Sequence, residues 1–411
     1  MKKENEGITQ YRYCLAATCF GIQAVGVGTH ISFGVFFSPL MNEFGWSRAT
    51  ISGAASVAIL CMGIMGIFVG RMNDRIGPKV MMTVTGLIFG AGLFLMSRLE
   101  EVWQLYVFYG VIIGTGLSSV DVIALSTIVR WFGRRRGLMT GIVKIGTDVG
   151  TFTIPIMVSL LITAFGWRQA YAIVAVAVSL TLIFIAQVLR RDPSQLKSSH
   201  ASGLKRKTEN SSSTNEGLSA HEAVRTGRFW IICAINLATA FSVFTIMVHI
   251  VPYAQDLKVS AAKAASVLAT IAGVSMAGRI IVGSAIDRVG SKRAMTISLI
   301  LLITAILWLQ MVDRFWMLYV FATIYGLAHG SFFTVISPIV AEFFGVKAHG
   351  ALFGIIAFFG TIGGAAGPLI AGYVYDNSGG YKPALWICSC ISVLGLILVL
   401  VLKPTEAGKA V

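Results

Sequence analysis

A ten-residue turn that occurs twice, GRMNDRIGPK at residues 70–79 and GSAIDRVGSK at residues 283–292, decides how this chain is built. Both copies follow the pattern G-x-x-x-D-R-x-G-x-K, and the offset between them also relates Pro155 to Pro368. A common offset shared by separate motifs indicates an internal repeat. The sequence therefore predicts two homologous halves, each carrying one copy of the turn.

The segments between these turns are strongly apolar. Hydrophobic residues make up 56% of the 411 positions and charged residues 12%, whereas soluble domains carry about 25% charged residues. A helix needs about 20 apolar residues to cross the hydrocarbon of a bilayer. We expect an all-α polytopic membrane protein with twelve transmembrane helices, near residues 12–37, 49–70, 80–97, 103–129, 138–164, 169–189, 229–254, 262–286, 294–312, 315–340, 350–375 and 384–402.

The repeat and the apolar runs together divide the chain into three parts. Residues 1–189 hold six spans and residues 229–411 hold six more. Residues 190–228 are rich in Ser, Asn and Lys and lack apolar periodicity, which predicts a flexible linker with a short surface helix near residues 218–226. Two pseudo-symmetric six-helix bundles form a known transporter architecture, whose substrate site lies near mid-membrane at the interface of the halves.

The distribution of charge predicts an orientation and excludes several classes of protein. The formal net charge is +15, but most Lys and Arg residues fall in alternate loops, as the positive-inside rule requires of a protein with cytoplasmic N- and C-termini. This placement argues against a nucleic-acid partner. The six cysteines lie in apolar runs without metal-ligand spacing, and no Walker loop, HExxH or GxSxG motif occurs. We expect no metal, no cofactor and no enzymatic activity.

The repeated turn, the six-plus-six pattern and the glycine-rich fifth span ending in Pro155 resemble the major facilitator superfamily over essentially the whole chain. Arg279 in span 8 and the stretch HISFGVFFSPLMNEFGWSRA at residues 30–49 are similar to the monocarboxylate transporter and oxalate–formate antiporter branch. This resemblance implies the major facilitator fold and a monomeric secondary active transporter that works by alternating access in the cell membrane. It also implies that Arg279 binds the carboxylate of the substrate.

The two turns also supply candidate gating residues. Asp74, Arg75, Asp287 and Arg288 are expected at helix ends on the cytoplasmic side, where an acid caps a neighbouring helix or pairs with a basic loop residue. Arg134 or Arg135 is the expected partner of Asp74. The resemblance implies that these contacts hold the cytoplasmic side shut; the alternative is a topology signal with no gating role.

Four charged residues lie inside predicted spans: Asp121, Lys144, Asp148 and Arg279. A charge at the centre of a membrane helix costs about 2.5–3.5 kcal/mol on insertion scales, so each needs a partner or a function. Lys144 and Asp148 are one turn apart and can pair, and Asp121 can approach from the neighbouring span. Arg279 has no acid within one turn, since Ser275 stands there, and its planar fork suits a carboxylate.

The balance of these charges predicts proton coupling. If one Asp neutralises Lys144 and the substrate neutralises Arg279, one acid of the pair Asp121 and Asp148 remains and is expected to carry a proton together with the anion. If Lys144 instead faces the substrate, a dicarboxylate becomes the expected cargo. An ion pair between Arg279 and an acid across the interface is the structural alternative.

Three histidines, His30, His249 and His329, lie within apolar runs. Each can hydrogen-bond an anion or relay a proton, although a lone His in a membrane helix more often bonds a neighbouring helix. We select His30, His249 and Ser275 as candidate substrate ligands, with Phe358 as part of an apolar wall. The predicted cargo is a small monocarboxylate such as lactate or pyruvate, moved with protons; an oxalate–formate type antiporter or another solute carrier of this fold is the alternative.

Overall fold

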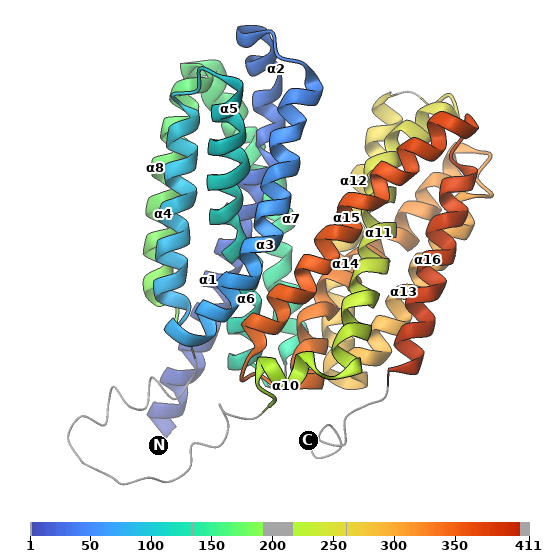
Figure 1. The fold of residues 1–411 in the computed structure, drawn as a ribbon. Helices are drawn as coiled ribbons and strands as arrows, with labels where there is room; N and C mark the ends of the chain where they lie inside the picture. Colours follow the sequence, from blue (N-terminus) through green and yellow to red (C-terminus); the bar gives the residue numbers. More distant parts are fainter. Residues whose placement is uncertain (1, 134, 192–216, 260, 403–411) are drawn as a thin grey trace. The chain divides into compact units, whose positions relative to one another are not determined.

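The structure, a computed structural model, describes residues 2–133, 135–191, 217–259 and 261–402. Twelve helical segments in these ranges are long and apolar enough to cross a membrane, from Thr9–Phe44 to Lys382–Val401. They follow the twelve apolar runs along the chain (Figure 1). The predicted all-α fold with twelve spans is therefore confirmed.

The helices group into two units, which we describe separately. Unit 1 comprises Met1–Gly133, Val143–Ala220 and Phe344–Gly354. Its helices are α1 (Lys2–Ile31), α2 (Phe33–Phe44), α3 (Arg48–Ile76), α4 (Pro78–Met96), α5 (Val102–Leu105), η1 (Tyr106–Ile113), α6 (Gly114–Trp131), most of α7 (Arg136–Phe165) and α8 (Trp167–Val188).

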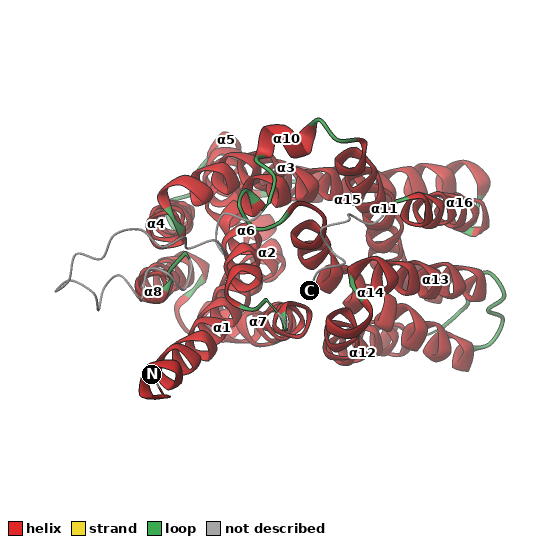
Figure 2. Cartoon of the chain, turned by 90° about the horizontal axis from the view of Figure 1, so that it is seen from below, coloured by secondary structure: helices red, strands yellow, loops and turns green. Residues whose placement is uncertain are grey.

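Unit 2 comprises Arg134–Ile142, His221–Phe343 and Ile355–Val411. The first turns of α7 therefore group with unit 2, and the first turns of α15 group with unit 1. The helices of unit 2, which Figure 2 shows from below, are α10 (Ala220–Val224), α11 (Gly227–Asp256), α12 (Ala261–Val289), α13 (Ser291–Leu309), α14 (Phe315–Phe344), most of α15 (His349–Ser378) and α16 (Lys382–Val401).

The last glycine of each repeated turn forms a one-residue joint between two helices. Gly77 separates α3 from α4 with φ of 100°, and Gly290 separates α12 from α13 with φ of 86°. Side chains rarely tolerate these values, and glycine adopts them without strain. The motif therefore folds as the sequence predicts, with its Asp-Arg pair in the last turn of the preceding helix.

Close packing of α1 on α7 positions a polar group inside unit 1. A Cβ atom added at Gly146 would lie 2.4 Å from the carbonyl oxygen of Phe20, and one at Gly150 would lie 2.0 Å from that of Ala24. Because only glycine permits this separation, the two backbones touch along this stretch. The contact brings Gln23 of α1 against the α7 residues between these glycines.

Two local features of unit 1 were not expected from hydropathy. The first span is interrupted at Ser32, whose hydroxyl donates to the carbonyl oxygen of Gly28 at 2.8 Å, and continues as α2. The span ending at Trp131 includes the π-helical segment η1. That wide turn carries Tyr109, which contacts His30, and such turns are frequent at functional sites.

The predicted linker falls largely outside the described residues, since residues 192–216 are not among them. The expected short helix before span 7 is present as α10. Just before it, the amide of Leu218 donates to the carbonyl oxygen of Phe344 at 2.9 Å, within unit 1.

Apolar side chains cover the outer faces of the helices. On α8, Val176, Leu180 and Phe184 follow one another at four-residue spacing, and Phe184 is 77% exposed. Residues at this spacing lie on one face of a helix. Such a face is suited to contact with lipid rather than water.

Candidate functional site

Arg279 is a buried cation within an apolar helix of unit 2. It lies about ten residues before the end of α12 at Val289, or about 15 Å along the helix, and it is 2% exposed. Its guanidinium carbon Cζ lies 6.0 Å from the centre of the Phe333 ring, within the range of a cation–π contact. Burial of a guanidinium in an apolar helix is costly, so the position needs a partner or a function.

Glycines bring α12 and α14 unusually close around this arginine. A Cβ at Gly330 would lie 2.3 Å from the carbonyl oxygen of Ser275, one at Gly326 would lie 2.9 Å from that of Ile271, and one at Gly278 would lie 3.2 Å from Leu327. Each is tighter than ordinary side-chain contact. The two backbones therefore meet directly at this level of unit 2.

This close approach sets two successive contacts between the helices. The hydroxyl of Ser275 lies 3.0 Å from Nδ1 of His329. One turn further along both helices, Arg279 lies over Phe333, whose ring centre is 5.1 Å from that of His329. We call Ser275, Arg279, His329 and Phe333 the α12–α14 cluster. It combines a cation, a titratable ring, a hydroxyl and an aromatic face.

Unit 1 holds a second polar cluster, formed by Gln23, Asp121, Lys144 and Thr147, which we call the α1–α6–α7 cluster. Lys144 donates from Nζ to Oδ1 of Asp121 at 2.8 Å and to Oε1 of Gln23 at 3.3 Å. The amide nitrogen of Gln23 donates to the same Asp121 oxygen at 2.8 Å, and Thr147 donates to Oε1 of Gln23 at 2.8 Å. Lys144 is 4% exposed and Gln23 fully buried.

These contacts resolve one of the sequence alternatives and leave the others as predictions. Lys144 pairs with Asp121 on the neighbouring span, the second of the two pairings considered. Asp148 lies half-buried one turn further along α7. The role of Lys144 in binding substrate and the roles of Asp121 and Asp148 in proton coupling stay predictions.

The two candidate histidines both make contacts between helices. In unit 1, Tyr109 donates from its hydroxyl to the carbonyl oxygen of His30 at 3.1 Å and lies 3.0 Å from Nδ1 of the same residue. In unit 2, His249 contacts the hydroxyl of Tyr381 at 3.2 Å and the carbonyl oxygen of Pro368 at 3.0 Å. Such bonds between helices are what the sequence analysis gave as the more common role of a lone histidine in a membrane helix. Substrate contact by either histidine stays a prediction.

The carbonyl oxygen of Pro368 assigns the tautomer of His249, because it can only accept a hydrogen bond and therefore requires a proton on Nε2. Burial, followed by the nearby carboxylate of Asp256, raises the pKa of Tyr381 to about 12, so its hydroxyl keeps a proton at neutral pH. That hydroxyl donates to Nδ1, and Nε2–H of His249 donates to the Pro368 carbonyl oxygen.

The candidate wall residue Phe358 lies half-buried on α15, with its ring centre 6.3 Å from that of Phe359.

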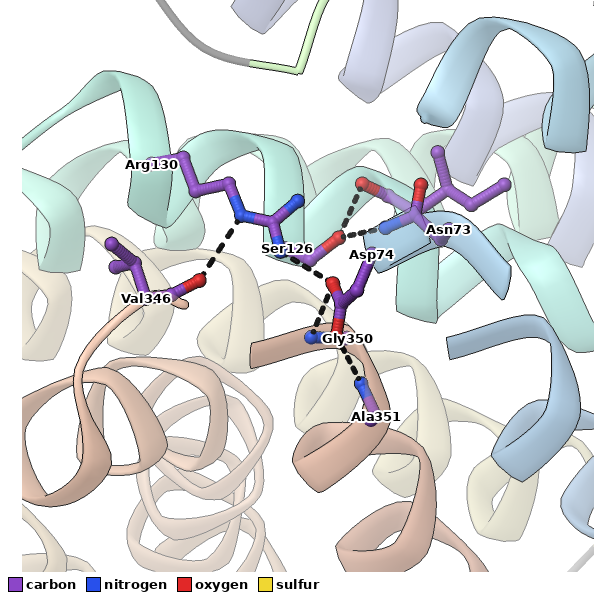
Figure 3. Close-up of polar contacts among 8 residues, drawn as sticks. Asn73, Asp74, Ser126, Arg130, Val346, Gly350 and Ala351 are labelled. Carbon is purple, nitrogen blue, oxygen red and sulfur yellow. Dashed lines mark hydrogen bonds and ion pairs between the residues drawn. The ribbon is translucent and has the colours of Figure 1, made fainter. Parts of the chain in front are cut away.

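The first repeated turn forms a charged site at the start of α15, which we call the Asp74 site (Figure 3). Oδ1 and Oδ2 of Asp74 accept hydrogen bonds from the amides of Gly350 at 3.1 Å and Ala351 at 2.9 Å. Arg130 pairs with the same carboxylate and donates from Nε to the carbonyl oxygen of Val346 at 3.3 Å. A carboxylate at a helix N-terminus gains from both the free amides and the helix dipole.

The second turn forms the equivalent Asp287 site in unit 2. Oδ1 and Oδ2 of Asp287 accept hydrogen bonds from the amides of Gly137 at 2.7 Å and Leu138 at 3.0 Å, in the first turn of α7. In each unit, therefore, the acid of the repeated turn caps a helix that begins in that unit and continues into the other.

The other gating candidates have different positions. Arg75 and Arg288 are exposed, and neither forms an ion pair with another described residue. Arg134, one of the expected partners of Asp74, lies outside the described residues, and Arg135 is exposed. The partner in the structure is Arg130, in the last turn of α6. The gating roles of the Asp74 and Asp287 sites stay predictions.

Comparison with known sequences identifies the fold family. The profile of the Major Facilitator Superfamily matches residues 15–283 and 231–411. The chain belongs to the Major Facilitator Superfamily. Members of this superfamily move small solutes across membranes, so the twelve spans are those of a multi-pass membrane transporter.

Relatives within the superfamily support the predicted resemblance to the monocarboxylate transporters. The chain is 24% identical to monocarboxylate transporter 12 of Rattus norvegicus over 391 residues, covering 90% of this chain and 79% of the relative. It is 22% identical to monocarboxylate transporter 7 of Homo sapiens over 454 residues, covering 96% and 87%. The fold matches the fucose:proton symporter FucP of E. coli with a TM-score of 0.70 at 12% identity, covering 97% of this chain and 99% of that chain.

Several residues in or near these sites escaped the sequence analysis, among them Gln23, Arg130 and Glu342. Gln23 is an uncharged amide in an apolar span, and its position opposite Lys144 became evident only from the packing of α1 on α7. Arg130 precedes the basic loop that drew attention to Arg134, and Glu342 caps α13 through the amide of Ser291 at 2.7 Å. The sequence feature that could have identified them is a polar residue near the end or the middle of an apolar run.

Proposed function

We propose that this protein is a proton-coupled symporter for a small monocarboxylate, of the size of lactate or pyruvate. It acts by alternating access in the cell membrane, with both termini in the cytoplasm. The observation that carries the proposal is the burial of Arg279 within the apolar helix α12.

Arg279 is suited to a carboxylate for two reasons. Its planar guanidinium offers two parallel N–H donors that match the two oxygens of a carboxylate. Its neighbour Phe333 supplies an apolar surface for the hydrocarbon part of a small acid. The relatives named as monocarboxylate transporters support the same substrate class.

The state of Lys144 favours a substrate with one carboxylate over one with two. A dicarboxylate needs a second cation, and Lys144 was the candidate named from the sequence. In the structure Lys144 is buried and donates to both Asp121 and Gln23. We therefore assign Lys144 to Asp121 rather than to a second carboxylate of the substrate.

Proton coupling follows from the cost of moving charge through the membrane. An anion carried alone moves a net negative charge, whereas an anion with a proton is neutral. The sequence nominates Asp121 and Asp148 for this proton, and with Asp121 assigned to Lys144 the remaining acid is Asp148. The charge balance predicts uptake that rises as the external pH falls.

The Asp74 and Asp287 sites are proposed to gate access from the cytoplasm. Each joins the acid of a repeated turn to the first turn of a long helix within the same unit. Breaking and reforming such contacts is a suitable step for alternating access.

Uptake of labelled acids into proteoliposomes tests the proposal. The panel comprises lactate, pyruvate, acetate, formate and oxalate, each with and without an inward proton gradient. We expect gradient-driven uptake of lactate or pyruvate, and a loss of about a hundredfold in Arg279→Lys, which keeps the charge and loses the planar fork. Arg168→Lys is the matched control, because Arg168 pairs with Glu43 at a partly exposed position; it should retain uptake within about twofold.

Two results would contradict the proposal. Absence of uptake and counterflow for every acid would reject an organic-anion carrier. Exchange of oxalate for formate without any response to a proton gradient would instead support the antiporter alternative.

A further inference from the structure

His329 lies at the midpoint of α14, well away from either end of the helix. The helix runs from Phe315 to Phe344, which places His329 about 21 Å from each end at 1.5 Å per residue. The side chain is half-buried rather than enclosed. A histidine at this depth of a transporter is a functional candidate, because an imidazole ring can carry a proton and can both donate and accept hydrogen bonds.

The contacts of His329 connect it to the proposed substrate anchor. Nδ1 lies 3.0 Å from the Ser275 hydroxyl, and Ser275 is one turn before Arg279 on α12. The rings of His329 and Phe333 are 5.1 Å apart, and Phe333 lies beneath the Arg279 guanidinium. The titratable ring and the cation are thus held on adjacent turns of the same two helices.

Building on the proposed function, we propose that His329 takes up the coupled proton, beside the carboxylate bound to Arg279. The proton enters from the aqueous phase, binds a ring nitrogen of His329, and leaves to the aqueous phase on the other side with the anion. No covalent bond of the substrate forms or breaks. Asp121 then serves as the counter-ion of Lys144, and the proton carrier lies in unit 2.

Electrostatics couples the two ligands in this arrangement. A proton on His329 alone places a second positive charge near Arg279, which is unfavourable in a poorly hydrated site. A carboxylate bound at Arg279 removes that repulsion and attracts the imidazolium. Each ligand therefore raises the affinity for the other by the same factor, as thermodynamic linkage requires.

The surroundings of His329 are compatible with both protonation states. The Ser275 hydroxyl donates to a neutral Nδ1 and accepts from a protonated one. Tyr325, one turn earlier on α14, donates its hydroxyl to the carbonyl oxygen of Val243 on α11 at 2.6 Å. His249, also on α11, is bonded to Tyr381 and Pro368. On α12, the charged residue nearest in sequence to Ser275, which contacts His329, is Arg279.

The experiment compares proton-driven uptake with exchange at equal pH in proteoliposomes loaded with lactate. In His329→Gln the amide retains a hydrogen bond to Ser275 but cannot titrate. We expect proton-driven accumulation to fall by about tenfold or more, and the pH dependence of uptake to disappear, while counterflow stays within about threefold of wild type. The control His221→Gln, at an exposed position on α10, should keep the wild-type pH profile.

Other outcomes separate this inference from the proposed function. Absence of counterflow in the wild-type protein rejects the proposed function itself. Normal counterflow with an unchanged pH profile in His329→Gln, or loss of the profile in Asp121→Asn or Asp148→Asn instead, overturns the assignment to His329. If His329→Gln fails to insert or exchange, Ser275→Ala decides: a displaced midpoint of the pH profile supports His329, and an unmoved midpoint rejects it.

Discussion

The Asp74 and Asp287 sites share one backbone arrangement and differ in charge. Both carboxylates accept two backbone amides at the start of a long helix, α15 for Asp74 and α7 for Asp287. Asp74 also pairs with Arg130, and both side chains of that pair are at most 10% exposed. Among the residues that the structure describes, no cation forms an ion pair with Asp287.

The repeat explains where the difference arises. Aligning Gly133 with Gly345 places Glu342 opposite Arg130. Glu342 accepts the amide of Ser291 at the start of α13, whereas the equivalent residue at the start of α4 is Pro78, which has no amide proton. The first half therefore has no α4 amide to cap at that position, and an arginine can stand where the second half needs an acid.

The two halves of the repeat therefore keep the same carboxylate-to-amide contact and differ in whether an arginine also pairs with the carboxylate. The carboxylate and the helix end are common to both halves. Because removing one partner of a buried ion pair is costly, we expect substitutions at the Asp74 site to affect transport more. Four predictions follow from this difference, from the largest expected effect to the smallest.

Asp74→Asn should slow transport about tenfold, and Asp287→Asn only about threefold, with substrate preference unchanged in both. The first substitution leaves Arg130 buried without its counter-ion, and breaking such a pair is costlier than losing a single charge at a helix end. Initial uptake rates, normalised to inserted protein, measure the difference. Equal losses at the two sites would show that Arg130 contributes nothing.

Arg130→Gln should reduce the Asp74 site to the strength of the Asp287 site. We expect a rate loss of about threefold, and a much smaller additional loss when Asp74→Asn is added. A double-mutant cycle on the same uptake rates isolates the coupling, which should reach about 1 kcal/mol or more because the residues are in direct contact. Additive losses would mean that the pair has no energetic role.

Gly70→Ala should destabilise the protein more than Gly283→Ala. A Cβ at Gly70 would lie 2.1 Å from the carbonyl oxygen of Gly350, and one at Gly283 would lie 2.7 Å from that of Gly137. Forcing a methyl group into such contacts typically costs about 1–3 kcal/mol. Thermal unfolding in detergent measures both variants, and the reverse order of melting temperatures would contradict the tighter approach at Gly70.

Glu342→Gln should lower stability by about 1 kcal/mol or less, because it weakens the cap on α13 without leaving a buried cation unpaired. Ser291→Pro removes the donor that Glu342 satisfies, which imitates the first half. In that background Glu342→Gln should cost almost nothing. A full additional loss of melting temperature in the double variant would show that Glu342 acts elsewhere.

Hydropathy and the repeat were sufficient to predict the twelve spans and the family, because both depend on long segments of sequence. They did not predict the interruption at Ser32 or the π-helical turn before Gly114. The hydropathy of the span does not change at either place, so the hydropathy pattern gives no sign of them. Spans of uniform hydropathy contain no information about where a helix changes its winding.

For the polar contacts, the sequence identified residues that need a partner more often than it identified the partner itself. The sequence selected Asp74 as a helix-end acid that caps a helix or pairs with a basic residue, and Lys144 as a charge inside a span that needs a partner. It did not select Arg130 among neighbouring arginines, because the partner depends on where α6 ends. The pairing of Ser275 with His329 depends on close approach at Gly330, a tertiary property that residue spacing does not determine.

The charge balance at Arg279 is the central claim, and the driving force for uptake tests it most directly. Proteoliposomes that contain the protein are given labelled lactate with either an inward proton gradient at zero membrane potential or a membrane potential at equal pH. One anion carried with one proton is neutral, so we predict accumulation with the proton gradient and none with the potential alone. Accumulation driven by the potential, with no response to the proton gradient, would contradict the account.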